Sequence, residues 1–162
     1  MRFLKRLVIG LAVTMSLIGC GKQNSREPID IPISQIRYSN GRKLRSEGYS
    51  ICSTLVLDYK DHALMSHVAP FMGGGTYSLD PNYVNASNVV EESVKMIEQK
   101  GINPRNCEAI VNSGDIFSLD KINQDLNDLG ITIKESKFDS KPRDLEYDPR
   151  SNTLTVEYRN LK

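Results

Sequence analysis

Two short apolar segments, residues 52–57 and 63–68, flank the polar segment 58–61, and this pattern constrains the fold more than any other in the chain. Runs of this length joined by a polar turn are typical of a β-hairpin. If residues 58–61 form a four-residue loop, Cys52 lies directly opposite His67 on the same face of the two strands. An imidazole that close can take the proton of a thiol, which leaves a nucleophilic thiolate. The hairpin therefore predicts a Cys52–His67 pair, although a register shifted by one residue would separate the two side chains.

Residues 1–19 have the composition of a secretory signal peptide, with a basic start and an apolar stretch too short to span a bilayer comfortably. The segment ends in Leu-Ile-Gly before Cys20, which resembles the lipobox of bacterial lipoproteins. That resemblance implies cleavage before Cys20 and attachment of lipid to its thiol, so we expect anchoring in the cell envelope without a membrane span. Gly21 in place of an aspartate favours the outer membrane, with the protein facing the periplasm or the exterior. The alternative is an ordinary secretory signal that happens to contain a cysteine.

The rest of the 162-residue chain is long enough for one domain with a hydrophobic core. Residues 20–30 are polar and predict the lipidated cysteine and a short tether, so the domain covers residues 31–162. All 20 acidic residues and most of the 21 basic ones lie beyond the signal peptide, and the two charges nearly balance there. We therefore expect no nucleic-acid partner.

Apart from Cys20, the chain has two cysteines, Cys52 and Cys107. An exported protein occupies a compartment that permits disulfides, so a structural Cys52–Cys107 bridge is an alternative use of the first cysteine. A zinc site could be drawn from these two cysteines, His62 and His67, but the four residues lack the short spacings typical of such sites. We expect neither a metal nor another cofactor.

The spacing of apolar residues predicts two amphipathic helices, at residues 86–100 and 119–129, whose apolar faces pack on the core. Residues 39–50 are polar and predict a loop. A glycine-rich loop with Gly73, Gly74 and Gly75 predicts a mobile flap beside the site. Further strands are expected at residues 31–37, 107–112, 131–135, 145–147 and 154–158. Without the first of these, the order from residue 52 onward is β-β-α-β-α-β-β-β, which predicts an α+β domain with helices on one side of a sheet.

Five segments occur in the order and spacing of one known family. Residues 46–52 (SEGYSIC) and 63–70 (ALMSHVAP) are similar to that family's T-L-G-L-G-S-C-V and G-G-x-A-H-x-M-L-P motifs, and looser similarities lie at 83–86, 108–117 and 142–149. Over residues 31–160 the chain therefore resembles the CheD chemoreceptor glutamine deamidases.

The resemblance implies an α/β/β layered sandwich with mixed and antiparallel sheets, a fold shared with some secreted deamidase toxins. It also implies a protein-glutamine glutaminase, which hydrolyses an exposed glutamine side chain of a partner protein to glutamate and ammonia. In this reading Cys52 is the nucleophile and His67 the general base and acid. Ser46 occupies the place of a threonine that supports the histidine, and its hydroxyl can make the same hydrogen bond.

The chain departs from the family pattern around both catalytic positions. Ile51 precedes the cysteine in place of serine, and Ala63 and Leu64 replace two glycines before the histidine. The family's receptor substrates expose their glutamines in the cytoplasm, whereas a lipoprotein faces the other side of the membrane. Either the substrate is another protein, or the domain is a binding or structural lipoprotein that has lost catalysis. In the second case a Cys52–Cys107 disulfide could staple the fold.

Overall fold

A computed structural model describes residues 27–70 and 83–160 of the chain. The expected signal peptide, the lipidated Cys20, most of the tether and the glycine flap at residues 73–75 lie outside the described residues. Within the described part, neither helix has the length and apolar character that crossing a bilayer requires.

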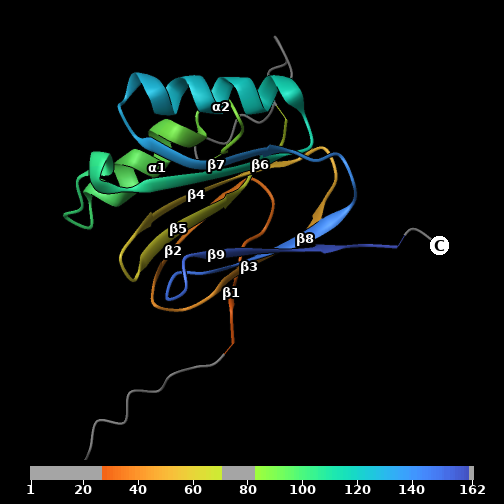
Figure 1. Cartoon of the computed structure of the whole chain (residues 1–162), viewed down its shortest axis with the longest axis horizontal. Coiled ribbons are helices and arrows are strands. Elements are labelled where there is room, and N and C mark those ends of the chain that lie inside the picture. Colours follow the sequence, from red (N-terminus) through yellow and green to blue (C-terminus); the bar gives the residue numbers. More distant parts are fainter. Residues whose placement is uncertain (1–26, 71–82, 161–162) are drawn as a thin grey trace, which may run out of the picture.

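Three layers make up the domain (Figure 1). Two α-helices, α1 (Val89–Glu98) and α2 (Ile116–Asp128), cover one face of a five-stranded sheet, and a four-stranded sheet covers the other face. The five-stranded sheet has the order β2 (Gln35–Asn40), β5 (His62–His67), β4 (Ser53–Tyr59), β6 (Glu108–Ser113) and β7 (Thr132–Phe138). The four-stranded sheet has the order β1 (Ile29–Asp30), β3 (Leu44–Tyr49), β8 (Arg143–Asp148) and β9 (Thr153–Tyr158). A 3₁₀ turn, Pro104–Asn106, precedes β6.

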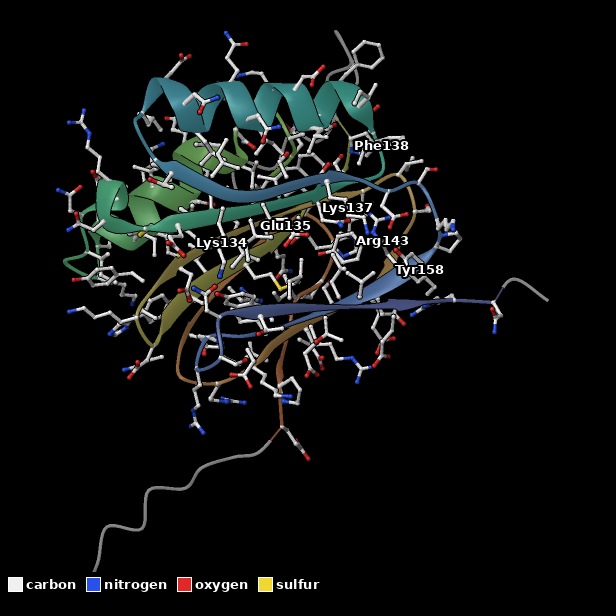
Figure 2. All side chains as sticks on the ribbon, in the orientation of Figure 1. Lys134, Glu135, Lys137, Phe138, Arg143 and Tyr158 are labelled. Atoms are coloured by element: carbon white, nitrogen blue, oxygen red, sulfur yellow. The ribbon has the colours of Figure 1, made fainter. Side chains whose placement is uncertain are left out.

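The predicted α+β class is correct, and so is the predicted order of elements from β4 to β9. Both sheets are mixed, because β7 pairs parallel to β6 and β1 pairs parallel to β3, while the other pairs are antiparallel. Side chains from both sheets fill the space between them, and Arg143 reaches into this layer from β8 (Figure 2).

The prediction of a loop at residues 39–50 was wrong, because β3 lies there. Its inward-facing side chains include Leu44 and the small polar Ser46, so the strand has little apolar alternation to reveal it. The strand predicted at residues 31–37 also begins later, at Gln35. Helix α2 begins earlier than predicted, because the Asp115 side chain accepts a hydrogen bond from the Ser118 N–H and caps the helix.

The hairpin that the sequence predicts is present, but its register differs. A two-residue turn at Lys60 and Asp61 joins β4 to β5, so that Tyr59 pairs with His62 and, further along, Ser53 bridges Val68. This register is shifted by two residues from the predicted one, and the directly opposed Cys52–His67 pair was therefore wrong. Because side chains alternate with a period of two, the even shift keeps both residues on the same face as diagonal neighbours.

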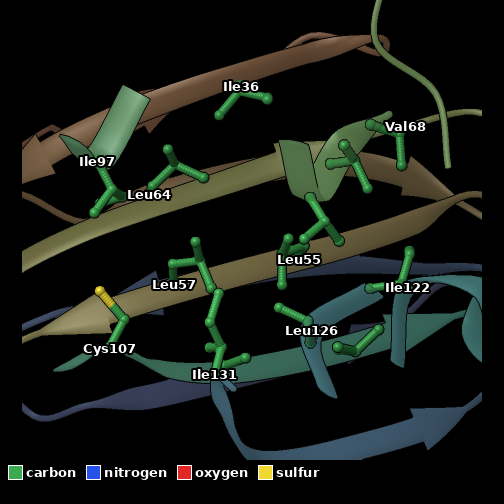
Figure 3. Close-up of a cluster of buried hydrophobic side chains, with 14 of the residues drawn as sticks. Ile36, Leu55, Leu57, Leu64, Val68, Ile97, Cys107, Ile122, Leu126 and Ile131 are labelled. Atoms are coloured by element: carbon green, nitrogen blue, oxygen red, sulfur yellow. The ribbon is translucent and has the colours of Figure 1, made fainter. Parts of the chain in front are cut away.

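Two hydrophobic clusters occupy the two sides of the five-stranded sheet. The cluster under the helices contains residues from both helices and the sheet, with the Cys107 thiol among them (Figure 3). The cluster between the sheets contains Cys52, Val56, Met65 and Tyr147 together with other buried residues. Each fully buried aliphatic side chain contributes about 1.5–3 kcal/mol to folding, so the two clusters hold the three layers together.

Gly114 connects β6 to α2 at a point of very close backbone approach. Its N–H donates to the Cys52 carbonyl oxygen at 3.1 Å, and a Cβ atom at this position would lie 1.7 Å from the Ser50 carbonyl oxygen. Only glycine therefore lets this junction pass against the segment that carries Cys52.

We predict that Gly114→Ala destabilises the domain by about 3 kcal/mol or more, because the backbone must move to relieve the overlap. The matched control is Gly101→Ala, where a Cβ atom would meet nothing within 4 Å and only the positive φ of 74° is unfavourable. That control should cost about 1 kcal/mol. Urea unfolding of both variants measures the difference, and equal losses of stability would contradict the close-approach argument.

Candidate functional site

The side chains of Cys52 and His67 lie in the layer between the two sheets. Cys52 directly precedes β4 and is 8% exposed, and His67 ends β5 and is 4% exposed. Ser46 and Tyr49 of β3 lie against the same imidazole from the facing sheet. All three site residues predicted from the sequence, Cys52, His67 and Ser46, therefore meet in one buried layer.

A β-bulge in β3 lies between Ser46 and Tyr49, the two residues of this strand that contact His67. The pairing between β3 and β8 shifts its register between Ser46 and Tyr49, where Gly48 has a φ of 81°. The extra residue turns Tyr49 back to the inner face, where its ring stacks on the His67 ring at a centroid distance of 3.9 Å. The Tyr49 hydroxyl donates to the Ser66 carbonyl oxygen at 3.0 Å, which holds the ring in place.

The Ser46 hydroxyl selects one tautomer of His67. Its Oγ donates to the Ile31 carbonyl oxygen at 2.5 Å and lies 2.8 Å from His67 Nδ1. A hydroxyl has one proton, and the carbonyl can only accept, so Oγ accepts a hydrogen bond from the Nδ1–H group. This assignment from the hydrogen-bond network leaves the Nε2 lone pair of His67 without a partner in a buried position.

Burial lowers the pKa of His67 to about 4, and the charge of Arg143 acts in the same direction, against a smaller opposing effect of the Ile31 carbonyl. The imidazole is therefore neutral at pH 7. A neutral ring with Nδ1–H bonded and Nε2 free is the form in which histidine accepts a proton.

Cys52 is a neutral thiol in this structure, because burial raises its pKa and the nearby positive charge of Arg143 offsets this only in part. The thiolate that the hairpin predicts can form is therefore not the resting state of Cys52. His67 Nε2 has no hydrogen-bond partner, so the thiol does not share its proton with the ring in this state. Catalytic hydrogen bonds are often absent without substrate and form only in the complex.

The alternative of a Cys52–Cys107 disulfide is wrong for this structure. Both thiols are free, and they belong to clusters on opposite faces of the five-stranded sheet. Burial and the charge of Asp58 raise the pKa of Cys107 to about 11, so this cysteine is an inert core residue. Among the described residues, no group of three or more histidine, cysteine or acidic side chains is arranged to hold a metal ion.

Arg143 is a residue of this layer that the sequence analysis did not select. Its side chain is fully buried, its Nε donates to Asn112 Oδ1 at 2.7 Å, and its Nη1 donates to the Ser50 and Lys141 carbonyl oxygens. The Nη2 atom is buried without a hydrogen-bond partner. The alternation of β8 could have predicted its burial, because Arg143 is two and four residues from Leu145 and Tyr147, which also face inward.

An open groove of about 570 Å³ leads from the surface to the imidazole. Ser46 and His67 lie in its wall, beside residues of β3 and of the segment between β1 and β2. The lining is completed by Asp30, Ile31, Pro32, Ile33, Arg45, Glu47 and Gly48. An extended segment of another molecule could reach the histidine through this opening.

The pH dependence of stability tests the state of His67. The ring is neutral in the folded chain, with a pKa of about 4, whereas the unfolded chain takes up the proton near pH 6.5. The contribution of neutral His67 to the free energy of unfolding is therefore complete above pH 6.5 and is lost as the pH falls toward 4. We predict that wild type loses about 2 kcal/mol more than His67→Gln across this window, measured by urea unfolding.

The matched control for this experiment is His62→Gln, at the other end of the same strand, where the ring is half-buried. This variant removes an imidazole without touching the Ser46–His67 hydrogen bond, so a change in pH dependence seen for His67→Gln and not for His62→Gln belongs to His67. If His67→Gln follows the wild-type curve between pH 6.5 and 4, the imidazole is not held neutral by the fold.

The site thus combines a buried thiol, a neutral imidazole with a selected tautomer, and a buried guanidinium in one layer. A thiol and a base of this kind are the groups that acyl-transfer enzymes use for nucleophilic attack. Comparisons with models of known protein families and with curated proteins found no match for this chain.

Proposed function

We propose that the protein is a protein-glutamine deamidase of the CheD type, attached to the cell envelope through lipid on Cys20. The observation that carries the proposal is the Ser46–His67 hydrogen bond, which leaves a neutral imidazole with a free Nε2 on the same sheet face as Cys52. The layering of helices, sheet and sheet is also the arrangement that the CheD resemblance implies.

In the proposed reaction, His67 Nε2 takes the Cys52 proton as the sulfur attacks the carboxamide carbon of a glutamine side chain. The C–N bond then breaks, the imidazolium returns its proton to the nitrogen, and ammonia leaves a thioester on Cys52. Water, deprotonated by the same Nε2, attacks the thioester, and the sulfur leaves with the proton as the thiol. The sum of the steps is hydrolysis of glutamine to glutamate and ammonia.

Burial has opposite consequences for the two halves of this mechanism. A neutral His67 is ready to act as a base, but the raised pKa of Cys52 makes its deprotonation unfavourable before substrate binds. Proton transfer must therefore accompany attack on the carbonyl, as in enzymes with a serine nucleophile. This arrangement protects the thiol from reacting without a substrate.

The groove beside His67 supports a protein as the substrate. It is open along one side, so a glutamine on a surface loop could enter while the partner's backbone stays outside. Its lining carries charges of both signs, on Arg45, Glu47 and Asp30. These charges could select substrates by the charge of the residues next to the glutamine. A lipid on Cys20 would place this groove near proteins of the envelope.

The test uses the full-length chain purified in detergent, with reduced, unfolded casein and a blocked glutaminyl-glycine dipeptide as amide donors. We predict that wild type releases ammonia and that Cys52→Ser and His67→Ala each lower the rate by about 10²-fold or more. Cys107→Ala and His62→Ala are the matched controls, since each removes the same residue type away from the site, and both should keep the wild-type rate.

Activity that persists in Cys52→Ser would exclude the cysteine mechanism. A folded wild-type protein that releases no ammonia from either donor would favour the other reading, a binding or structural lipoprotein without catalysis.

Ser46 offers a graded test of the same site. Ser46→Ala removes the acceptor for Nδ1–H and should lower the rate about tenfold or more while Cys52 and His67 remain. Ser46→Thr keeps the hydroxyl and should retain most of the activity. If alanine and threonine behave alike, the hydroxyl does not orient the imidazole.

A further inference from the structure

Arg143 carries a buried positive charge on which the Asp139 carboxylate acts without forming an ion pair with it. Its side chain is fully buried, yet none of the ion pairs among the described residues includes it. Its hydrogen bonds go to neutral oxygens, those of Asn112, Ser50 and Lys141, and Nη2 has no partner. Burying a charge in this way is costly, so a purely structural role does not explain it well.

The guanidinium is held beside the nucleophile from two directions. Nη1 donates at 3.3 Å to the carbonyl oxygen of Ser50, two residues before Cys52, and Nε is fixed by Asn112 of β6. The Arg143 Cζ also lies over the Tyr49 ring, 5.8 Å from its centroid, and that ring stacks on His67. One cation therefore contacts both the segment that carries the thiol and the ring that supports the base.

We propose that Arg143 is the positioning residue that supplies the counter-charge for the Cys52 thiolate as it forms. The catalytic meaning of this role depends on the proposed deamidase function, but the electrostatic coupling does not. A positive charge in a low-dielectric layer favours the thiolate over the thiol and favours neutral over protonated His67. The first effect assists transfer of the thiol proton, whereas the second opposes it and keeps His67 unprotonated before attack begins.

Other groups around the pair do not supply this charge. Tyr49 from β3 and Arg143 from β8 act electrostatically on Cys52, and Tyr49 is neutral at pH 7. His67 from β5 lies on the same sheet face as Cys52 and is also neutral at pH 7. Asp139 and Tyr158 act on Arg143 itself and help to keep it protonated against the effect of burial. Among the described residues, Arg143 is therefore the charged group that acts on the Cys52 thiol.

The experiment measures thiol ionisation directly and needs no substrate. The full-length chain in detergent is labelled with ¹³Cβ-cysteine, and the Cys52 resonance is titrated by NMR, with Cys107 as the internal reference on the other face of the sheet. We predict that Arg143→Met raises the Cys52 midpoint by about one pH unit, which is about a tenfold loss of thiolate at a given pH. Arg143→Lys keeps the charge and should titrate close to wild type.

Arg159→Met is the matched control, because this arginine lies just beyond β9, is exposed and pairs with Asp144 and Glu47. It should leave the Cys52 midpoint unchanged. Coincident midpoints for wild type and Arg143→Met would overturn the proposal. A shifted midpoint together with no ammonia release would keep the proposal and reject the deamidase function.

A second measurement uses wild type alone, in case Arg143→Met does not fold. Alkylation rates with anionic iodoacetate and neutral iodoacetamide are compared at Cys52, and the ratio is independent of how often the site opens. A nearby cation should raise that ratio about threefold or more above the ratio for the same cysteine in the urea-unfolded chain. Equal ratios in the folded and unfolded chains would overturn the proposal.

Discussion

Strand β4 is buried on both faces, and the rest of the architecture follows from this constraint. Six of its seven residues are buried, from Ser53 to Asp58. One face needs the helices α1 and α2 as a cover, and the other needs the four-stranded sheet. A single sheet with helices on one side would leave Val56 and the neighbouring Met65 in water, at a cost of about 1.5–3 kcal/mol for each such side chain.

The space between the sheets also contains polar side chains, and their hydrogen bonds determine where the site lies. Ser53, Thr54 and Ser66 are fully buried and find partners within the sheets. His67 Nε2 and Arg143 Nη2 do not, although each belongs to a side chain whose other nitrogens are bonded. Buried polar groups are nearly always paired, so His67 Nε2 and Arg143 Nη2, two of the five unpaired buried side-chain atoms among the described residues, are available for contacts with a ligand.

Low exposure is the common cause of the unusual ionisation of both reacting groups. It lowers the pKa of His67 and raises that of Cys52, so both groups are neutral at rest. The charge of Arg143 favours the thiolate and opposes imidazolium formation. A site of this kind has the groups for acyl transfer in place but forms the reactive anion only when a substrate carbonyl is present to accept it.

Much of the fold could be predicted from local patterns. The periodicity at residues 86–100 and 119–129 predicted both helices, because each helix buries one continuous face. The apolar runs around residue 55 predicted the central hairpin, because its strands are buried on both faces. Strand β3 was not predicted, because Ser46 occupies an inward position at which the alternation of apolar and polar residues in a strand would place an apolar residue. The predicted end of α2 differs from the observed one by a single residue. Its start was predicted too late, because it depends on the Asp115 cap, which the spacing of apolar residues does not reveal.

By itself, the sequence determined the α+β class, the order of elements from β4 to β9 and the identity of Cys52, His67 and Ser46 as candidate site residues. Only the tertiary structure decided the two-residue turn at Lys60 and Asp61, which makes Cys52 and His67 diagonal rather than opposite neighbours. It also decided the burial of Arg143 and the separation of Cys52 from Cys107. The physical reason is that turn length, sheet stacking and burial depend on contacts between residues far apart in the chain, whereas periodicity and turn composition are local.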